Sequence, residues 1–267
     1  MLGSVGAFSR WEVLMGEVAR FVSSPVKIVD AIPAGWSLFR EKEDTTAAHR
    51  FAIALDGETM EGHFRAYELH FAKKERRGDL DALMECLSDI NSLRRFPEES
   101  LGAHYARYMD KNELNFDAFV EECVRMHEGY YSSSPTSEAQ KSWFMMNNIC
   151  HDFFHVLGGY DIDAMGELCV QAFFSAQSGS RAAGLLARIG SFAAMVAAPD
   201  ISAQKMVRRA YGQGREARNF SLVDWVAIVG APIDHVRQNL NVTPNEFYEQ
   251  VPKDRLERIL VGTGGGN

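Results

Sequence analysis

The stretch EAQKSWFMMNNICHDFFHVLGGYDIDAMGE, residues 138–167, decides both the fold class and the candidate site. Apolar residues recur in it at helical spacing, and the glycine pair 158–159 predicts the end of a helix that spans about 138–157. Either aspartate of the DID segment can cap the helix that follows, which carries Glu167 near its start. We therefore predict two consecutive helices joined by a tight turn.

Three ionisable side chains of the first helix are expected to share one face. At about 3.6 residues per turn, His151, Asp152 and His155 lie at roughly 0°, 100° and 40° around the axis. Such groups, placed among apolar residues, must pair with one another, be hydrogen-bonded or hold a cation, and we favour the cation. The apolar neighbours are Phe144, Met145, Met146, Ile149, Phe153, Phe154 and Leu157.

Two histidines at positions i and i+4 can bind one divalent cation, as they do in the HExxH motif of metalloproteases. Asp152 replaces the glutamate of that motif and is one methylene shorter, so we expect it to bind the metal or to brace a ligand. Glu167 is expected to fold back from the next helix as a fourth ligand. This donor set favours zinc, with iron, manganese or magnesium as alternatives.

Other interpretations of the same residues are weaker. A ferritin-like di-iron bundle needs Glu-x-x-His pairs, and Glu121 and Glu122 are not followed by a histidine three residues later. An HD-type phosphohydrolase would need a separate histidine and a distant aspartate, for which His127 and Asp200 are the candidates. The remaining alternative is a hydrogen-bonded polar seam in an ordinary core.

Composition indicates an ordinary globular protein of 267 residues, with 46% hydrophobic and 24% charged residues. The formal net charge of −8 argues against nucleic-acid binding, which needs a basic face. No secretory signal is evident, and the longest apolar run, 182–198, is shorter than the roughly 20 residues that span a bilayer. Four widely spaced cysteines indicate free thiols. We expect a cytoplasmic protein that can lie peripherally on the inner face of a membrane.

Helical spacing recurs along the rest of the chain, and we predict an all-α fold, a compact multi-helix bundle. Two or three helices are expected to follow the one that carries Glu167. We divide the chain into a helical N-terminal extension (1–75), a metal- and lipid-binding helical domain (76–250) and a C-terminal segment with a disordered tail (251–267). The other expected helices lie near 48–55, 60–71, 80–93, 101–109 and 116–126.

The motif HDxxH, followed after eleven residues by Glu167, resembles the signature of the coenzyme Q (ubiquinone) biosynthesis Coq-four family. The similarity extends over roughly 78–245 and is fairly specific at the motif. Its flanking segments are SLGAHYARYMDKNELNFDAF from Ser100, GELCVQAFFSAQSG from Gly166, AYGQGREARNFSLVDW from Ala210 and APIDHVRQNLNV from Ala231.

The resemblance implies an all-helical protein that binds a metal through His151, Asp152, His155 and Glu167. It also implies binding of a prenylated aromatic or isoprenoid lipid, contact with a membrane surface and with other quinone-biosynthesis proteins, and oxidative loss of the ring carboxyl group from a polyprenylated benzoate. An apolar pocket is expected to hold the lipid. Its apolar lining would add Leu185, Leu186, Phe192 and Met195 to the neighbours of the motif.

Three further residues are candidates for binding the lipid substrate. Tyr105 and Arg215 match positions of the family's motifs, and Phe154 lies within the metal motif. The other arginines near Arg215 are expected to form a solvated helix face. Four convergent ionisable ligands favour an enzyme over a lipid-binding scaffold without chemistry. The resemblance implies that this enzyme acts as a decarboxylase or lyase. We expect a homo-oligomer.

Overall fold

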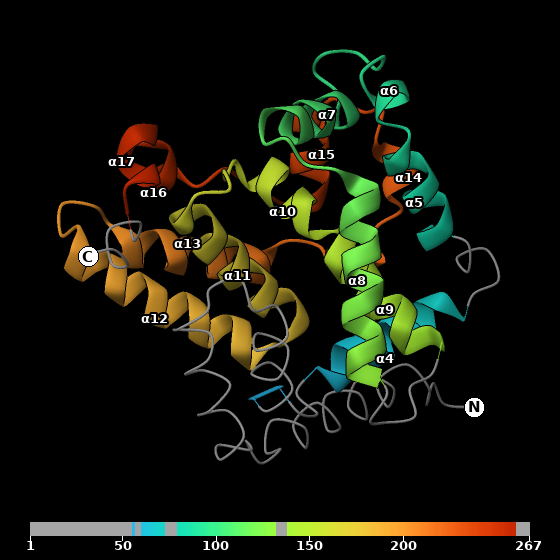
Figure 1. Cartoon of the computed structure of the whole chain (residues 1–267), viewed down its shortest axis with the longest axis horizontal. Helices are drawn as coiled ribbons and strands as arrows, with labels where there is room; N and C mark the ends of the chain where they lie inside the picture. The colour runs from blue at the N-terminus through green and yellow to red at the C-terminus, as the bar shows by residue number, and fades with distance from the viewer. Residues whose placement is uncertain (1–54, 57–59, 73–78, 132–137, 260–267) are drawn as a thin grey trace, which may run out of the picture.

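Every regular element in the described part of the chain is a helix (Figure 1). Within it, the only sheet-like pairing is an antiparallel bridge between Ser100 and Pro232. The prediction of an all-α fold is confirmed. None of these helices is both long and apolar enough to cross a lipid bilayer. The computed structural model describes residues 55–56, 60–72, 79–131 and 138–259.

In the described part of the chain, every helix of ten or more residues ends by residue 216, and the helices after it have eight residues or fewer. The expectation of only two or three closing helices was therefore wrong. Prolines divide this region, since Pro232 and Pro252 begin two of the short helices, and Asn241 ends one of them with φ of 57°. The elements are α4 (Glu61–Phe71), α5 (Asp79–Ser88), α6 (Ile90–Leu93), α7 (Leu101–Lys111), α8 (Phe116–Tyr131), α9 (Glu138–Ile149), α10 (His151–Gly158), α11 (Ala164–Ser178), α12 (Arg181–Ala197), α13 (Ala203–Glu216), the 3-10 helix η2 (Phe220–Leu222), α14 (Trp225–Ile228), α15 (Ile233–Leu240), α16 (Glu246–Glu249) and α17 (Lys253–Glu257).

Helix α11, which carries Glu167, packs along both α12 and α13 (Figure 1). Glycines set how closely these helices approach. A Cβ on Gly214 of α13 would lie 2.5 Å from the carbonyl oxygen of Phe173, and one on Gly190 of α12 would lie 2.3 Å from a methyl carbon of Leu168. A larger residue at Gly214 would collide with the backbone of α11, and one at Gly190 would force the Leu168 side chain to move. Both glycines therefore allow α11 to lie close to its neighbours.

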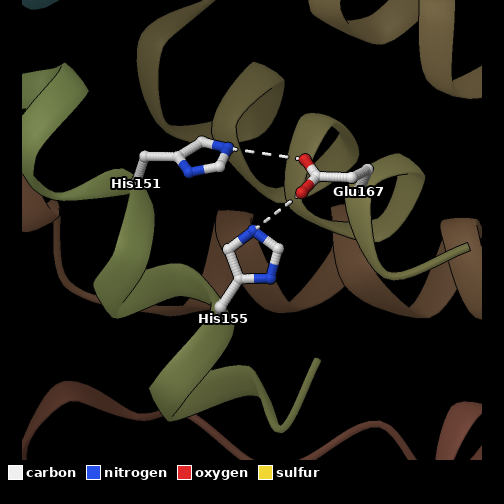
Figure 2. A group of neighbouring side chains, drawn as sticks. All are labelled: His151, His155 and Glu167. Atoms are coloured by element: carbon white, nitrogen blue, oxygen red, sulfur yellow. Dashed lines mark ion pairs between the residues drawn. The ribbon is translucent and has the colours of Figure 1, made fainter. Parts of the chain in front are cut away.

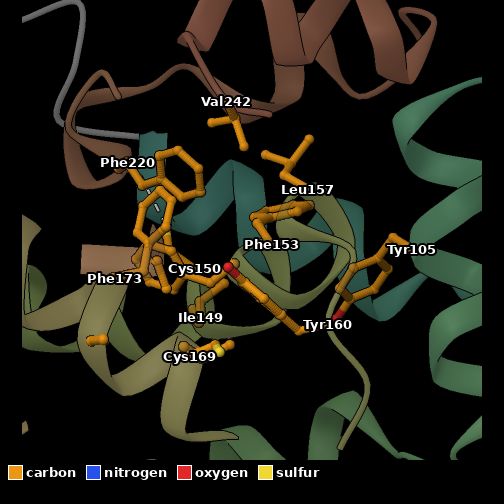
Figure 3. Close-up of a cluster of buried hydrophobic side chains, with 14 of the residues drawn as sticks. Tyr105, Ile149, Cys150, Phe153, Leu157, Tyr160, Cys169, Phe173, Phe220 and Val242 are labelled. Carbon is orange, nitrogen blue, oxygen red and sulfur yellow. Dashed lines mark hydrogen bonds between the residues drawn. The ribbon is translucent and has the colours of Figure 1, made fainter. Parts of the chain in front are cut away.

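Stacked aromatic rings hold α10 against the core. The ring of Phe154 lies parallel to that of Phe220, with centroids 4.8 Å apart, and Phe153 stacks on Trp225 at 4.2 Å. Phe173 of α11 packs against both Phe154 and Phe220, as part of the cluster that Figure 3 shows. Each such pair contributes about 0.5–1.5 kcal/mol beyond the area it buries. The two histidines of α10 therefore project from a fixed helix.

Two helices that the sequence predicts as continuous are interrupted. The helix expected over 138–157 breaks at Cys150, whose ψ of −12° departs from the helical value, and it becomes α9 and α10. The helix expected over 80–93 breaks at Asp89. The carboxylate of Asp89 accepts the N–H of Ser92 at 3.0 Å and so caps a new helix, α6.

The structure tests only part of what the sequence predicts for the two ends of the chain. Helix α4 confirms the helix expected at 60–71, whereas nearly all of the helix expected at 48–55 lies outside the described residues. The tail expected to be disordered, 260–267, also lies outside them. The division into extension, domain and C-terminal segment stays a prediction.

Replacing Gly214 by alanine is expected to destabilise the protein, because the new Cβ would overlap the Phe173 carbonyl oxygen. Such overpacking costs about 1–3 kcal/mol. Gly212 provides a matched control on the same helix, since a Cβ there meets nothing within 4 Å. Gly212→Ala should be neutral or stabilising by up to about 1 kcal/mol. Denaturant unfolding of both variants measures the difference, and equal stabilities would contradict the packing described for α11 and α13.

Candidate metal centre

Three potential ligands converge where α10 meets α11 (Figure 2). His151 begins α10, His155 follows one turn later on the same face, and Glu167 lies in the first turn of α11. One ligand atom from each of the three lies within 4.8 Å of the others. The prediction that two consecutive helices bring these side chains together is confirmed for these residues.

The distances suit an ion between the side chains. Glu167 places Oε1 3.4 Å from Nε2 of His155 and Oε2 3.7 Å from Nε2 of His151. Two donors bound at about 2.1 Å to a tetrahedral zinc ion lie roughly 3.4 Å apart. His155 is fully buried, and neither of its ring nitrogens has a hydrogen-bond partner among the described residues. Buried polar atoms without a hydrogen bond are costly, and a cation between Nε2 and the Glu167 carboxylate that faces it at 3.4 Å would bind both groups.

The turn between the two helices fixes this geometry. Gly159 ends α10 with φ of 74°, a conformation that favours glycine. Asp163 then caps α11 by accepting the N–H groups of Met165 and Gly166 at 2.9 and 3.0 Å. Tyr248 of α16 donates its hydroxyl to the Asp163 carboxylate, so a distant helix holds the cap in place. Of the two aspartates considered for the cap, the structure uses the second.

Neighbouring groups in the cluster stabilise the charged forms of Glu167 and His151. Burial raises the pKa of Glu167, but contact with His155 and the charge of His151 outweigh it, so that this pKa lies below its usual value. Burial lowers the pKa of His151, but Asp152 and Glu167 outweigh it, and the result is a raised pKa. The cluster therefore favours an ionised carboxylate facing positive charge, which is what a cation would provide.

Asp152 lies beside the cluster, and no oxygen of its carboxylate belongs to the group of three. Its Oδ1 is 3.7 Å from Nδ1 of His151, and its Oδ2 accepts the hydroxyl of Tyr105 at 3.5 Å. Burial and the Asp152 charge raise the pKa of Tyr105, which keeps this hydroxyl protonated. A carboxylate on the second nitrogen of a metal-bound histidine orients the ring, so this position suits bracing. Whether Asp152 also binds the metal stays a prediction.

The cluster is more open than the sequence led us to expect. His155 is buried, but the side chains of His151 and Glu167 are 32% and 41% exposed. The apolar residues of α10 explain this difference, because Phe153 and Phe154 point into the aromatic core, away from the ligands' side of the helix. One side of the cluster is therefore accessible to a molecule from solvent or from a membrane surface.

The residues expected to bind a lipid lie in different places. Tyr105 is close to the cluster through Asp152. Phe154 is packed within the aromatic core, and Arg215 is exposed on the last turn of α13. Of the residues expected to extend an apolar lining, Phe192 is 58% exposed on the surface of α12. Lipid contacts by Tyr105, Phe154 and Arg215 stay predictions.

Tyr108 was not among the predicted site residues, yet its ring stacks on His155 with centroids 5.5 Å apart. A signal was available, because Tyr108 follows Tyr105 by three residues and so shares its helical face. The two tyrosines form the wall of α7 that faces the metal motif. The phosphohydrolase alternative loses support, since Asp200 is exposed and pairs with Arg255 at 2.6 Å.

Comparisons with known proteins identify the family of the chain. A family model described as "Coenzyme Q (ubiquinone) biosynthesis protein Coq4" matches residues 82–246. The mitochondrial ubiquinone biosynthesis protein COQ4 of Kluyveromyces lactis is 26% identical over 173 residues, 60% of this chain and 49% of that protein. The one from Candida albicans strain SC5314 is 25% identical over 183 residues, 65% and 52%. The chain thus spans about half the length of these relatives.

The fold also occurs in a solved structure. A crystal structure of a Nostoc punctiforme protein assigned to ubiquinone biosynthesis superposes with a TM-score of 0.54 at 20% sequence identity. The superposition covers 81% of this chain and 98% of that one. At this identity the likeness supports the all-helical fold and carries no information on chemistry.

Zinc is expected to stabilise the metal-free protein by about 2.7 kcal/mol at a free concentration of 100 times Kd. For a chain of this size that corresponds to a rise in Tm of roughly 5–10 °C, measured by scanning calorimetry. Glu167→Gln should abolish the rise, because it removes the charged donor shared by both histidines. His235→Ala, which changes an exposed histidine of α15, should retain it. An equal rise in both variants would place the metal elsewhere.

Asp152→Asn tests whether this residue braces His151 or binds the ion itself. If Asp152 braces, the variant should still hold one metal per chain, with an affinity about 10–100-fold lower. Elemental analysis gives the stoichiometry, and competition with a chelator gives the affinity. Loss of the metal in Asp152→Asn to the same extent as in Glu167→Gln would instead make Asp152 a direct ligand.

Proposed function

The chain belongs to the Coq4 family of coenzyme Q (ubiquinone) biosynthesis proteins, and on this premise we propose that it is a metal-dependent enzyme of ubiquinone biosynthesis. Its substrate would be a benzoate with a polyprenyl chain, from which it removes the ring carboxyl group. The match over residues 82–246 includes both ligand helices and the turn between them. It therefore includes the three residues that the proposal requires.

One observation carries the proposal: His151, His155 and Glu167 place three donor atoms around one point, with solvent access on one side. Two histidines and one glutamate form a donor set of catalytic zinc sites, which keep their fourth position for water or substrate. A closed structural site would use four protein ligands, commonly thiolates. The donor set favours zinc, with iron, manganese or magnesium as the alternatives.

The reaction breaks the bond between the ring carbon and the carboxyl carbon, and CO2 leaves. In simple decarboxylation the electron pair stays on the ring carbon, which takes up a proton. In the oxidative form, dioxygen and a two-electron reductant enter, and the products are the ring hydroxyl, CO2 and one water. The oxidative form thus needs a reductant from another protein or a cofactor, which fits a partner among the quinone-biosynthesis proteins.

Each residue of the site would have a separate role in this reaction. A cation held by His151, His155 and Glu167 would supply Lewis-acid stabilisation of the substrate's carboxylate oxygens. Asp152 holds the ring of His151 in orientation, and the protonated hydroxyl of Tyr105 keeps Asp152 in place. Tyr108 covers one face of His155 and keeps bulk water from that ring. Phe154 and Arg215 stay the candidates for contacting the lipid.

A second candidate is a lipid-binding scaffold without chemistry, and the surface of α12 favours it. Ile189, Phe192 and Val196 are 43%, 58% and 68% exposed and share one helical face. Exposed apolar faces of this kind often mark contacts with proteins or membranes. In this alternative the metal only orders the site, and α12 binds a membrane surface, a partner protein or a second copy of the chain.

We propose a peripheral location on a membrane face, where a polyprenyl substrate resides. The sequence led us to expect a cytoplasmic protein, whereas the relatives from Kluyveromyces lactis and Candida albicans are mitochondrial by name. The expected contact with a membrane face is compatible with either compartment, the cytoplasm or the mitochondrion.

His155→Ala and Glu167→Gln are expected to lower turnover of a prenylated hydroxybenzoate by at least about 10²-fold, because each removes stabilisation of developing charge. The measurement is mass-spectrometric detection of the product that has lost CO2, with dioxygen and a reductant supplied. His235→Ala serves as the control. Full turnover by metal-free protein would end the enzyme proposal, and product formation by the isolated protein would reject the scaffold.

A further inference from the structure

A cavity of about 500 Å³ lies behind His155, and the proposed reaction does not use it. His155 belongs to its lining, whereas His151 and Glu167 do not. Its walls come from α7, from the turn between α10 and α11, and from α15 to α17. A volume of this size is typical of sites for small molecules.

The lining is cationic, although the whole chain carries a formal charge of −8. Lys111 of α7 and Lys253 of α17 share one carboxylate, that of Asp161, with Lys253 at 3.8 Å. Within the described residues, Arg107 donates to the backbone carbonyl of Glu98 at 2.8 Å and pairs with no carboxylate. The lining also contains Glu249, so its four cationic side chains (Arg107, Lys111, Arg237 and Lys253) face two carboxylates, and positive charge still exceeds negative charge.

Two more residues of the lining support this conclusion. Burial lowers the pKa of His104, and the charges of Arg107 and Arg237 lower it further. Arg237 donates to the carbonyl oxygens of Leu157 and Val156 at 3.0 and 3.3 Å and also pairs with Asp234 at 3.3 Å, so its guanidinium is fixed at the end of α10. A local excess of cations held in this way favours an anionic ligand.

We propose that this cavity binds an oxyanion of the phosphate class. Arg107, Lys111 and Lys253 balance its charge. A phosphate suits the cavity better than a carboxylate, because its oxygens can meet cations from both α7 and α17.

The anion can be a soluble phosphate ester or the headgroup of a phospholipid, and two binding experiments on the metal-free full chain distinguish them. Calorimetric titration with inorganic phosphate uses chloride at equal ionic strength as the reference. Sedimentation with phosphatidylcholine vesicles, with and without phosphatidic acid, tests the headgroup. Uptake in the first experiment indicates a soluble ligand, and uptake only in the second indicates a lipid.

Arg107→Ala and Lys253→Ala are each expected to weaken whichever uptake is observed by about tenfold. Both side chains are on the surface, so the fold should persist, and an unchanged Tm checks this. Arg125→Ala removes an exposed cation of α8 and should bind like the unaltered chain. Absence of saturable uptake in both experiments, or equal binding by all three variants, would overturn the proposal.

These tests measure binding without metal or turnover, so the proposed enzyme can fail while the anion site stands, and the reverse.

Discussion

The approach of one carboxylate to two imidazoles is the constraint on which the rest of the structure depends. Glu167 can face His151 and His155 at 3.7 and 3.4 Å only if α10 and α11 keep a fixed spacing. Aromatic stacking holds α10, and glycine contacts hold α11 between its neighbours. The turn between them adds a left-handed Gly159 and a capped helix start. The packing of the core thus fixes the geometry of this small cluster.

The sequence was sufficient for the features that local rules govern. Helical spacing and the absence of strand patterns predicted the fold class. The glycine pair predicted the end of α10, and the aspartates predicted a cap for α11. Because both helices follow one another in the chain, the spacing of the HDxxH motif and Glu167 was enough to predict that three of these ligands meet. The same motif carried the resemblance to the family, which the match over 82–246 confirms.

Features that depend on contacts between distant segments could not be predicted in this way. The breaks at Asp89 and Cys150 arise within stretches whose apolar spacing continues without interruption. The opening of the cluster depends on how the phenylalanines of α10 meet η2 and α14. The cationic cavity combines α7 with α17, more than a hundred residues apart, and no local pattern relates Lys111 to Lys253.

The bond from Tyr248 to Asp163 has a practical consequence for anyone who shortens the chain. The family match ends at residue 246, yet this tyrosine lies just beyond it and holds the start of the helix that carries Glu167. Its hydroxyl also accepts the N–H of Asp161 at 3.0 Å. A fragment trimmed to the family boundary would lose the clamp on the ligand turn, so crystallisation or expression fragments should extend through α17.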